Sequence, residues 1–168
     1  MKYFCISLLF FLLTLPEKGL EPLPQTTAEI RFSFISKNVE GTIEGFEFNG
    51  EITPANWEVS NFEGSVTVET IKTGNFIRDW HLKNRKYFNQ SEFPFISFKS
   101  TSVEIEDGSI KVSGTLKIKD IAKPIIWIFK KEGNTLKGSS TIYTSDFDIN
   151  IQKNREDNKV DIFMNLIL

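Results

Sequence analysis

The chain has 168 residues, a length typical of one domain, and a net charge of −2 at neutral pH. Charges of both signs are interspersed, and no basic face carries stacking aromatic residues, so nucleic acid is excluded as a partner. With one histidine and one cysteine, two-histidine zinc or iron sites are excluded, and we expect no metal and no other cofactor. The 16 phenylalanines are the unusual feature of the composition.

The N-terminus has the pattern of a targeting segment. Lys2 gives a basic start, and Phe4 to Leu15 form a twelve-residue apolar run. This run is too short to span a membrane and has the length of a signal-peptide core. We therefore expect residues 1–24 to be a removed signal peptide and linker, residues 25–168 to form the folded domain, and the protein to be periplasmic or secreted. The alternative is an uncleaved anchor. Removal would take Cys5 with it, leaving no disulfide.

The next residues alternate between apolar and polar, as in strands with one buried face. Ile30, Phe32 and Phe34 begin this pattern, which continues over Val39–Ile52. Glycines inside that second run predict bulges or bends of the kind that close a sheet into a barrel. Residues 66–68 give a further strand.

The stretch from Thr70 to Ser100 is too irregular to be one strand. Its apolar residues at 76, 77, 80 and 82 fit one or two turns of helix. The chain returns to an extended pattern at residues 96–100. We therefore expect residues 76–95 to form a lid between two strands.

Strand patterns then recur at hairpin spacing as far as the C-terminus. Residues 98–105 and 110–118 predict two strands joined by a turn at Asp107–Gly108. Residues 125–129 are apolar without a break, so either both faces are covered or one faces a ligand. The clearest alternation runs from Val160 to Leu168. These patterns predict an all-β antiparallel barrel or sandwich.

Three longer motifs support a family resemblance. The first runs from Thr73 to Ser100 and reads TGN-x-x-RD-x-HL-K, then YF, then FP-x-ISFKS. The second covers Gly45–Ile52, and the third covers Ser113–Ile125. Together they resemble the YceI-like proteins, secreted lipocalin-like barrels associated with polyisoprenoid binding. The resemblance implies an eight-stranded lipocalin-like antiparallel β-barrel with a short helical lid segment between two strands. It also implies a long-chain isoprenoid ligand, either a polyisoprenoid or an isoprenoid quinone.

Three residues depart from the pattern of that family, and all three fall at turns. Asp120 and Asp148 stand where glycine is usual, and Ala122 stands where threonine is usual. Aspartate tolerates the left-handed region better than most residues. We expect Asp120 to adopt a left-handed or tight-turn conformation.

Eight aromatic residues are candidates for contact with the ligand. Six share the inward parity of their strands, and two would close the lid over one end. They are Phe32, Phe34, Phe46, Phe48, Phe88, Phe93, Phe98 and Trp127. A small barrel holds either its own side chains or one small ligand. The leading hypothesis is an exported lipid carrier. The alternative is a fully packed secreted β-module that binds a protein partner and has no lipid cavity.

Arg78, Asp79 and His81 are expected to serve the structure of the lid, because irregular backbone needs hydrogen-bond partners. The alternative is direct contact with a ligand head group. A triad of Asp79, His81 and a serine can be drawn, but no nucleophile elbow marks the serine. We therefore expect no enzymatic activity.

Two kinds of association stay open. Lys117, Lys119 and Lys123 share one parity, which is typical of a solvated face or of an approach surface for anionic lipid. If these lysines form an approach surface, the protein would make transient contact with a membrane surface there. The sequence also leaves open a homodimer.

Overall fold

A computed structural model describes residues 26–168, so the signal peptide expected over residues 1–24 lies outside the described part of the chain. The strands are β1 (Thr27–Phe34), β2 (Val39–Ile43), β3 (Glu47–Phe48), β4 (Glu63–Thr67), β5 (Phe95–Glu106), β6 (Ser109–Ile118), β7 (Ile121–Glu132), β8 (Thr135–Tyr143) and β9 (Lys159–Ile167). The helices are α1 (Phe76–Lys83) and the short 3-10 segments η1 (Ile35–Lys37), η2 (Trp57–Val59), η3 (Val68–Thr70), η4 (Thr144–Phe147) and η5 (Glu156–Asn158). None of the helices within residues 26–168 is long and apolar enough to cross a bilayer.

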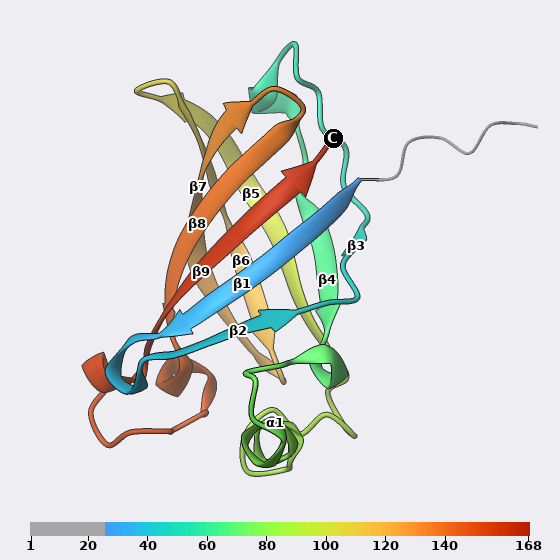
Figure 1. The fold of residues 1–168 in the computed structure, drawn as a ribbon. Coiled ribbons are helices and arrows are strands. Elements are labelled where there is room, and N and C mark those ends of the chain that lie inside the picture. Colours follow the sequence, from blue (N-terminus) through green and yellow to red (C-terminus); the bar gives the residue numbers. More distant parts are fainter. Residues whose placement is uncertain (1–25) are drawn as a thin grey trace, which may run out of the picture.

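All nine strands belong to one antiparallel sheet that curls into a barrel, in the order β2-β1-β9-β8-β7-β6-β5-β4-β3 (Figure 1). The expected all-β antiparallel barrel with a helix between two strands is confirmed. Within residues 26–168 the strand count is nine and not eight, because the run 39–52 does not form one strand. Gly45 interrupts it with a left-handed φ of 69°. A Cβ atom at Gly45 would also lie 2.5 Å from Oγ1 of Thr67.

Near the lid, the barrel closes through hydrogen bonds between β2 and the segment that follows β4. Thr42 and Lys72 exchange two backbone hydrogen bonds of 2.9 and 3.0 Å. The N–H of Thr67 donates to the carbonyl of Glu44 at 3.2 Å. The hydroxyl of Thr70 accepts from the N–H of Glu44 at 2.8 Å. Within the described chain, β2 and β3 do not pair with each other.

The alternation of buried and exposed residues matches the sequence pattern in the long strands. Every second residue of β6 from Ile110 to Ile118 is buried. In β7, Trp127 and Phe129 point inward, whereas Ile126 and Ile128 are 49% and 39% exposed. The unbroken apolar run of β7 therefore has one face inside the barrel and the other in solvent.

The turns between strands confirm the hairpin at Asp107–Gly108 and the expected tight turn at Asp120. Asp107 and Gly108 both have positive φ, 49° and 73°, as a tight hairpin turn requires. In the turn between β6 and β7 the left-handed residue is Lys119, with φ 59°, and Asp120 completes the turn. The ammonium group of Lys119 lies 3.6 Å from the carboxylate of Asp148. Asp148 is itself left-handed, with φ 55°.

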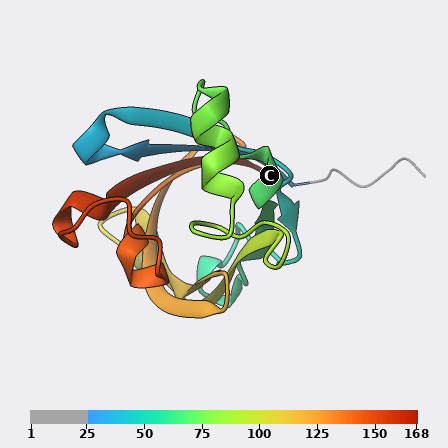
Figure 2. The same cartoon turned by 90° about the horizontal axis from the view of Figure 1, so that it is seen from below.

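The polar segment between β8 and β9 is organised by a buried asparagine. The side-chain oxygen of Asn158 accepts from the N–H groups of Ile151 and Gln152 at 3.0 and 2.9 Å. Its amide nitrogen donates to the carbonyls of Gln152 and Asn154. Since all the polar capacity of this side chain is used, the irregular segment can lie against the same end of the barrel as α1 (Figure 2).

Candidate ligand-binding cavity

The barrel encloses a cavity of about 560 Å³. Binding sites for small molecules typically measure about 300–1,000 Å³. Apolar side chains from the strands form most of its wall, among them Ile30, Ile43, Val66, Ile96, Ile142, Val160, Ile162 and Met164. The phenylalanines therefore do not fill the interior. The fully packed module is wrong on this point.

Seven of the eight aromatic residues singled out in the sequence line this cavity. They are Phe32, Phe34, Phe46, Phe48, Phe88, Phe98 and Trp127. Phe93 is the exception, because it lies outside the cavity lining. It sits on the loop that leads to β5, where its N–H donates to the carbonyl of Asn89 at 2.9 Å. Contact between any of these residues and a ligand stays a prediction.

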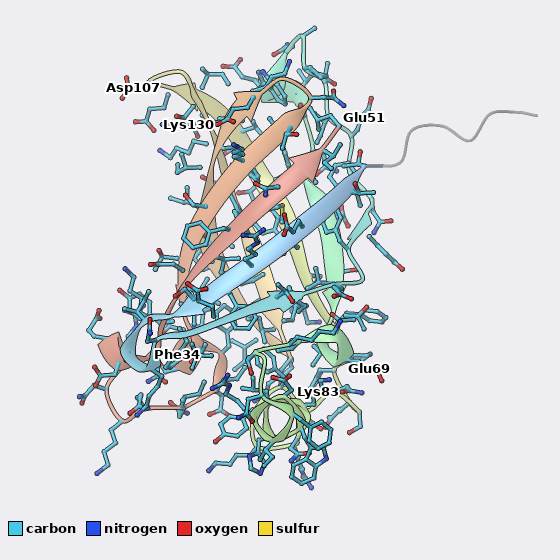
Figure 3. The ribbon with its side chains drawn as sticks, viewed as in Figure 1. Phe34, Glu51, Glu69, Lys83, Asp107 and Lys130 are labelled. Atoms are coloured by element: carbon cyan, nitrogen blue, oxygen red, sulfur yellow. The ribbon has the colours of Figure 1, made fainter. Side chains whose placement is uncertain are left out.

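An aromatic stack that the sequence did not reveal forms part of the cavity wall. The ring of Phe129 lies between those of Phe62 and Trp127, with centroid distances of 5.6 and 5.7 Å. Phe129 pairs with Ile110 near the hairpin at Asp107, which lies at the end of the barrel away from the lid (Figure 3). Phe62 is isolated among polar residues, so no periodicity could mark it. Phe129 lies in the apolar run of β7, which was its only signal.

Glycines on neighbouring strands let several of the cavity rings lie close to the sheet. A Cβ atom at Gly138 would lie 2.3 Å from the ring of Phe129. A Cβ atom at Gly41 would lie 2.3 Å from the ring of Phe32. A Cβ atom at Gly114 would lie 2.4 Å from the ring of Phe98. Since no real side chain tolerates such contacts, these glycines are what allow the rings to lie against the wall and leave the centre open.

The lid helix α1 crosses the opposite end of the barrel (Figure 2). It begins after Asn75, whose side chain accepts a hydrogen bond from the N–H of Arg78 at 3.0 Å, as a helix N-cap does. At its C-terminal end, the carbonyls of Leu82 and Lys83 accept hydrogen bonds from the N–H groups of Phe88 and Gln90, both at 3.0 Å. The lid is therefore a folded-back unit that satisfies its own helix ends.

Arg78 and Asp79 both bind Thr73, the residue at which the chain turns into the lid. Asp79 accepts hydrogen bonds from the N–H of Thr73 at 2.8 Å and from its hydroxyl. Arg78 donates to the hydroxyl and to the carbonyl of Thr73, both at 2.7 Å. The two side chains thus complete the hydrogen bonding of irregular backbone, the kind of contact expected from the sequence. Arg78 also borders the cavity.

His81 does not share that arrangement. Its side chain is exposed and makes no hydrogen bond to any residue within 26–168. Its ring packs against Trp80, with 5.1 Å between the ring centroids, and borders the cavity from the lid. The carboxylate of Asp79 is bonded to Thr73 and not to the imidazole, so these two residues do not form the acid–base pair of a triad.

Thr144 borders the cavity, but its hydroxyl oxygen is itself buried. The residue is only 6% exposed and lines the cavity. Its hydroxyl has no hydrogen-bond partner among the described residues. A buried hydroxyl without a partner is unfavourable by about 1–3 kcal/mol.

No group of three or more potential metal ligands occurs in the part of the chain that the structure covers.

The model of the YceI-like domain matches residues 23–167 of the chain. The protein belongs to the YceI-like family. The resemblance stated from the three sequence motifs is thereby confirmed. This YceI-like chain is 26% identical over 120 residues to a UPF0312 protein of Ectopseudomonas mendocina, covering 65% of this chain and 63% of that protein. It is 26% identical over 85 residues to the protein YceI of Salmonella arizonae, covering 51% of this chain and 44% of that protein. The matches span less than two thirds of the length of these curated relatives.

Solved structures support the same fold for this YceI-like chain. BcnA of Burkholderia cenocepacia superposes with a TM-score of 0.70 at 16% identity, covering 84% of this chain and 96% of BcnA. The YceI protein of Campylobacter jejuni gives a TM-score of 0.63 at 20% identity, covering 76% and 82% of the two chains. A polyisoprenoid binding domain from Saccharophagus degradans gives 0.55 at 12% identity, covering 84% and 91%.

Proposed function

We propose that this YceI-like protein is a non-enzymatic carrier that holds a long apolar chain in its barrel. The observation behind the proposal is the cavity of about 560 Å³, walled by apolar side chains and roofed by a short helix. The ligand class we favour is a polyisoprenoid or an isoprenoid quinone. The Saccharophagus degradans domain of the same fold, described as polyisoprenoid binding, supports that choice.

The size of such a ligand is compatible with useful affinity. Drug-sized ligands gain about 0.3 kcal/mol per heavy atom. About 25 buried carbons would then give roughly 7–8 kcal/mol, which corresponds to micromolar binding. This affinity would retain a ligand in solution and still allow its release.

The direct experiment is mass spectrometry of organic extracts from the purified protein. A long isoprenoid at near-stoichiometric amount is the expected result. A lipid of another class would keep the carrier and change its ligand. A protein that is empty after purification, and that takes up no isoprenoid when one is offered, would contradict the proposal.

Export is a separate part of the proposal, because a carrier of this kind would serve lipids outside the cytoplasm. The basic start and the apolar run Phe4–Leu15 motivate it. Cell fractionation should find the protein in the periplasm or the medium, with a new N-terminus near residue 25. Exported protein that still begins at Met1 would exclude cleavage and favour an anchor.

A further inference from the structure

The outer side of the lid helix presents large apolar residues to solvent. Phe76, Ile77 and Trp80 are 83%, 63% and 57% exposed. Trp80 lies four residues after Phe76 and three after Ile77, so the three side chains neighbour one another on α1. We call these three residues the outer lid face. Soluble monomers rarely leave such a cluster uncovered unless it binds something.

The charge of the lid differs in sign from that of the whole chain. Residues 76–92 contain four basic side chains, Arg78, Lys83, Arg85 and Lys86, against two acidic ones, Asp79 and Glu92. The segment therefore carries a net charge of +2 on a chain whose net charge is −2. Arg78 and Asp79 are engaged with Thr73. The other basic residues are Lys83, which lies three residues after Trp80 on α1, and Arg85 and Lys86, which lie in the turn that follows the helix.

The outer lid face also lies at the end of the barrel where the lid covers the cavity. Ile77 belongs both to this face and to the cavity lining. We propose that the outer lid face docks on an anionic lipid bilayer, with the basic residues against the head groups. An aromatic and apolar cluster beside basic side chains is the arrangement of an interfacial helix.

A second copy of the chain fits this face less well than a bilayer does. In a two-fold dimer the same patch meets itself, so two lids of net charge +2 would face each other. A bilayer containing acidic lipids offers the complementary charge. It also offers the apolar phase in which a long isoprenoid dissolves. Only this last argument rests on the proposed function.

Binding to vesicles tests the inference. The probes are phosphatidylcholine vesicles with and without phosphatidylglycerol, and the measurement is co-sedimentation. We expect binding to the acidic vesicles that weakens as salt is added. Serine at all three positions of the outer lid face should weaken binding at least tenfold. Because the apolar run near the N-terminus would itself bind bilayers if present, all variants are compared with the same N-terminus.

Matched variants separate the lid from general stickiness. Serine is placed at three exposed apolar positions on the outside of the barrel, Ile126, Ile128 and Phe163. Likewise, glutamine at Lys83, Arg85 and Lys86 is compared with glutamine at Lys130, Lys131 and Lys137. Lys130 marks the end of the barrel away from the lid (Figure 3). Both control sets should bind vesicles like the unchanged protein.

Brominated lipids locate the contact, because they quench only tryptophan that enters the bilayer. Quenching should be strong in the unchanged protein and largely lost in Trp80→Phe, which keeps an aromatic ring and should still bind. Quenching that persists in Trp80→Phe would place the contact elsewhere and overturn the inference.

Three other results would also overturn the inference. The first is that the protein does not bind acidic vesicles. The second is that the lid variants and the control variants lose vesicle binding equally. The third is that the double variant Lys117→Glu, Lys123→Glu loses vesicle binding and the lid variants keep it. A dimer in solution that the serine variant turns into a monomer would assign the face to a second copy. None of these measurements uses a bound isoprenoid, so failure of docking and failure of the carrier function are distinguishable.

Discussion

Phe129 on β7 and Gly138 on β8 face each other in the sheet, and the ring of Phe129 occupies the space where a side chain at 138 would stand. The ring is also held from its faces by Phe62 and Trp127. A methyl group at 138 would push the ring into this stack or toward the cavity. The pair therefore links the packing of the aromatic stack to the volume of the cavity.

Gly138→Ala should lower the free energy of unfolding by about 1–3 kcal/mol, because the new methyl overpacks a stacked ring. Urea denaturation measures this. The control is Ser139→Ala, which changes an outward, exposed residue by one atom on the same strand. Adding Phe129→Leu should recover part of the loss, since the pair is in contact. A stability equal to that of the unchanged protein would mean that the ring moves freely.

Truncation of a ring at the cavity should cost less than truncation of a ring in the packed core. Phe48 lines the cavity, whereas Phe147 is 1% exposed and lies outside the lining. Phe147→Ala should lose about 3–5 kcal/mol. Phe48→Ala in the ligand-free protein should lose less than half of that and should alter lipid retention. Equal losses with unchanged lipid content would argue that the space does not hold a ligand.

Asp79→Ala should loosen the lid and leave the barrel intact. The carboxylate provides the hydrogen bonds that hold Thr73, and a hydrogen bond to a charged group contributes about 1.5–3 kcal/mol. Hydrogen exchange across residues 73–93 should speed up about tenfold or more, with global stability changed by less than about 1 kcal/mol. Glu69→Ala, an exposed carboxylate close to the lid end of the barrel (Figure 3), should have no such effect.

His81→Ala should change the free energy of unfolding by less than about 0.5 kcal/mol, since the side chain is exposed and makes no hydrogen bond within the described chain. Hydrolysis of a p-nitrophenyl ester should be equally low before and after the change. A robust esterase activity that disappears in the folded variant would contradict a binding role and make His81 catalytic.

Asp146 and Arg155 should make stability depend on pH in the acid range. The Arg155 guanidinium donates two hydrogen bonds of 2.8 and 2.7 Å to the carboxylate and holds the pKa of Asp146 below its ordinary value. A lowered folded-state pKa adds stability above the unfolded pKa of aspartate, about 3.9, which is lost as pH falls through the folded-state value. Asp146→Asn should therefore lose about 0.5–1 kcal/mol at neutral pH and almost nothing well below that value.

Thermal unfolding from neutral pH into the acid range measures this difference. The control is Asp107→Asn, the same substitution at an exposed hairpin tip where asparagine also tolerates positive φ. Asp107→Asn should leave the melting temperature close to that of the unchanged protein. If the two variants behave alike, the contact between Asp146 and Arg155 does not contribute.

Sequence pattern was sufficient where each residue of a strand has one clear environment. The alternation in β6 and β9 specified which residues point inward, and the irregular stretch with its apolar spacing specified the lid helix. The six aromatic residues predicted from strand parity also line the cavity. Phe93 was predicted from its place in the lid, and it lies on a loop outside the lining, where alternation carries no information.

The remaining features depend on contacts between distant residues. The stack of Phe62 on Phe129 joins the start of β4 to β7. No glycine in β5 indicates the bulge between Ser100 and Ser102. Asn158 looks like one polar residue among many until its four hydrogen bonds are seen. Such features are set by tertiary packing, which one sequence does not display.

Within the described chain, every hydrogen bond of residues 73–93 is made to another residue of the same segment, as for Thr73 with Asp79 and for Phe88 with Leu82. No residue of α1 is fully buried. Moving residues 73–93 aside therefore breaks apolar contacts with the barrel but no hydrogen bond to it. For the proposed carrier, this would separate exchange of a ligand from unfolding. The residence time of the ligand would then change through the lid while the melting temperature of the barrel stays the same.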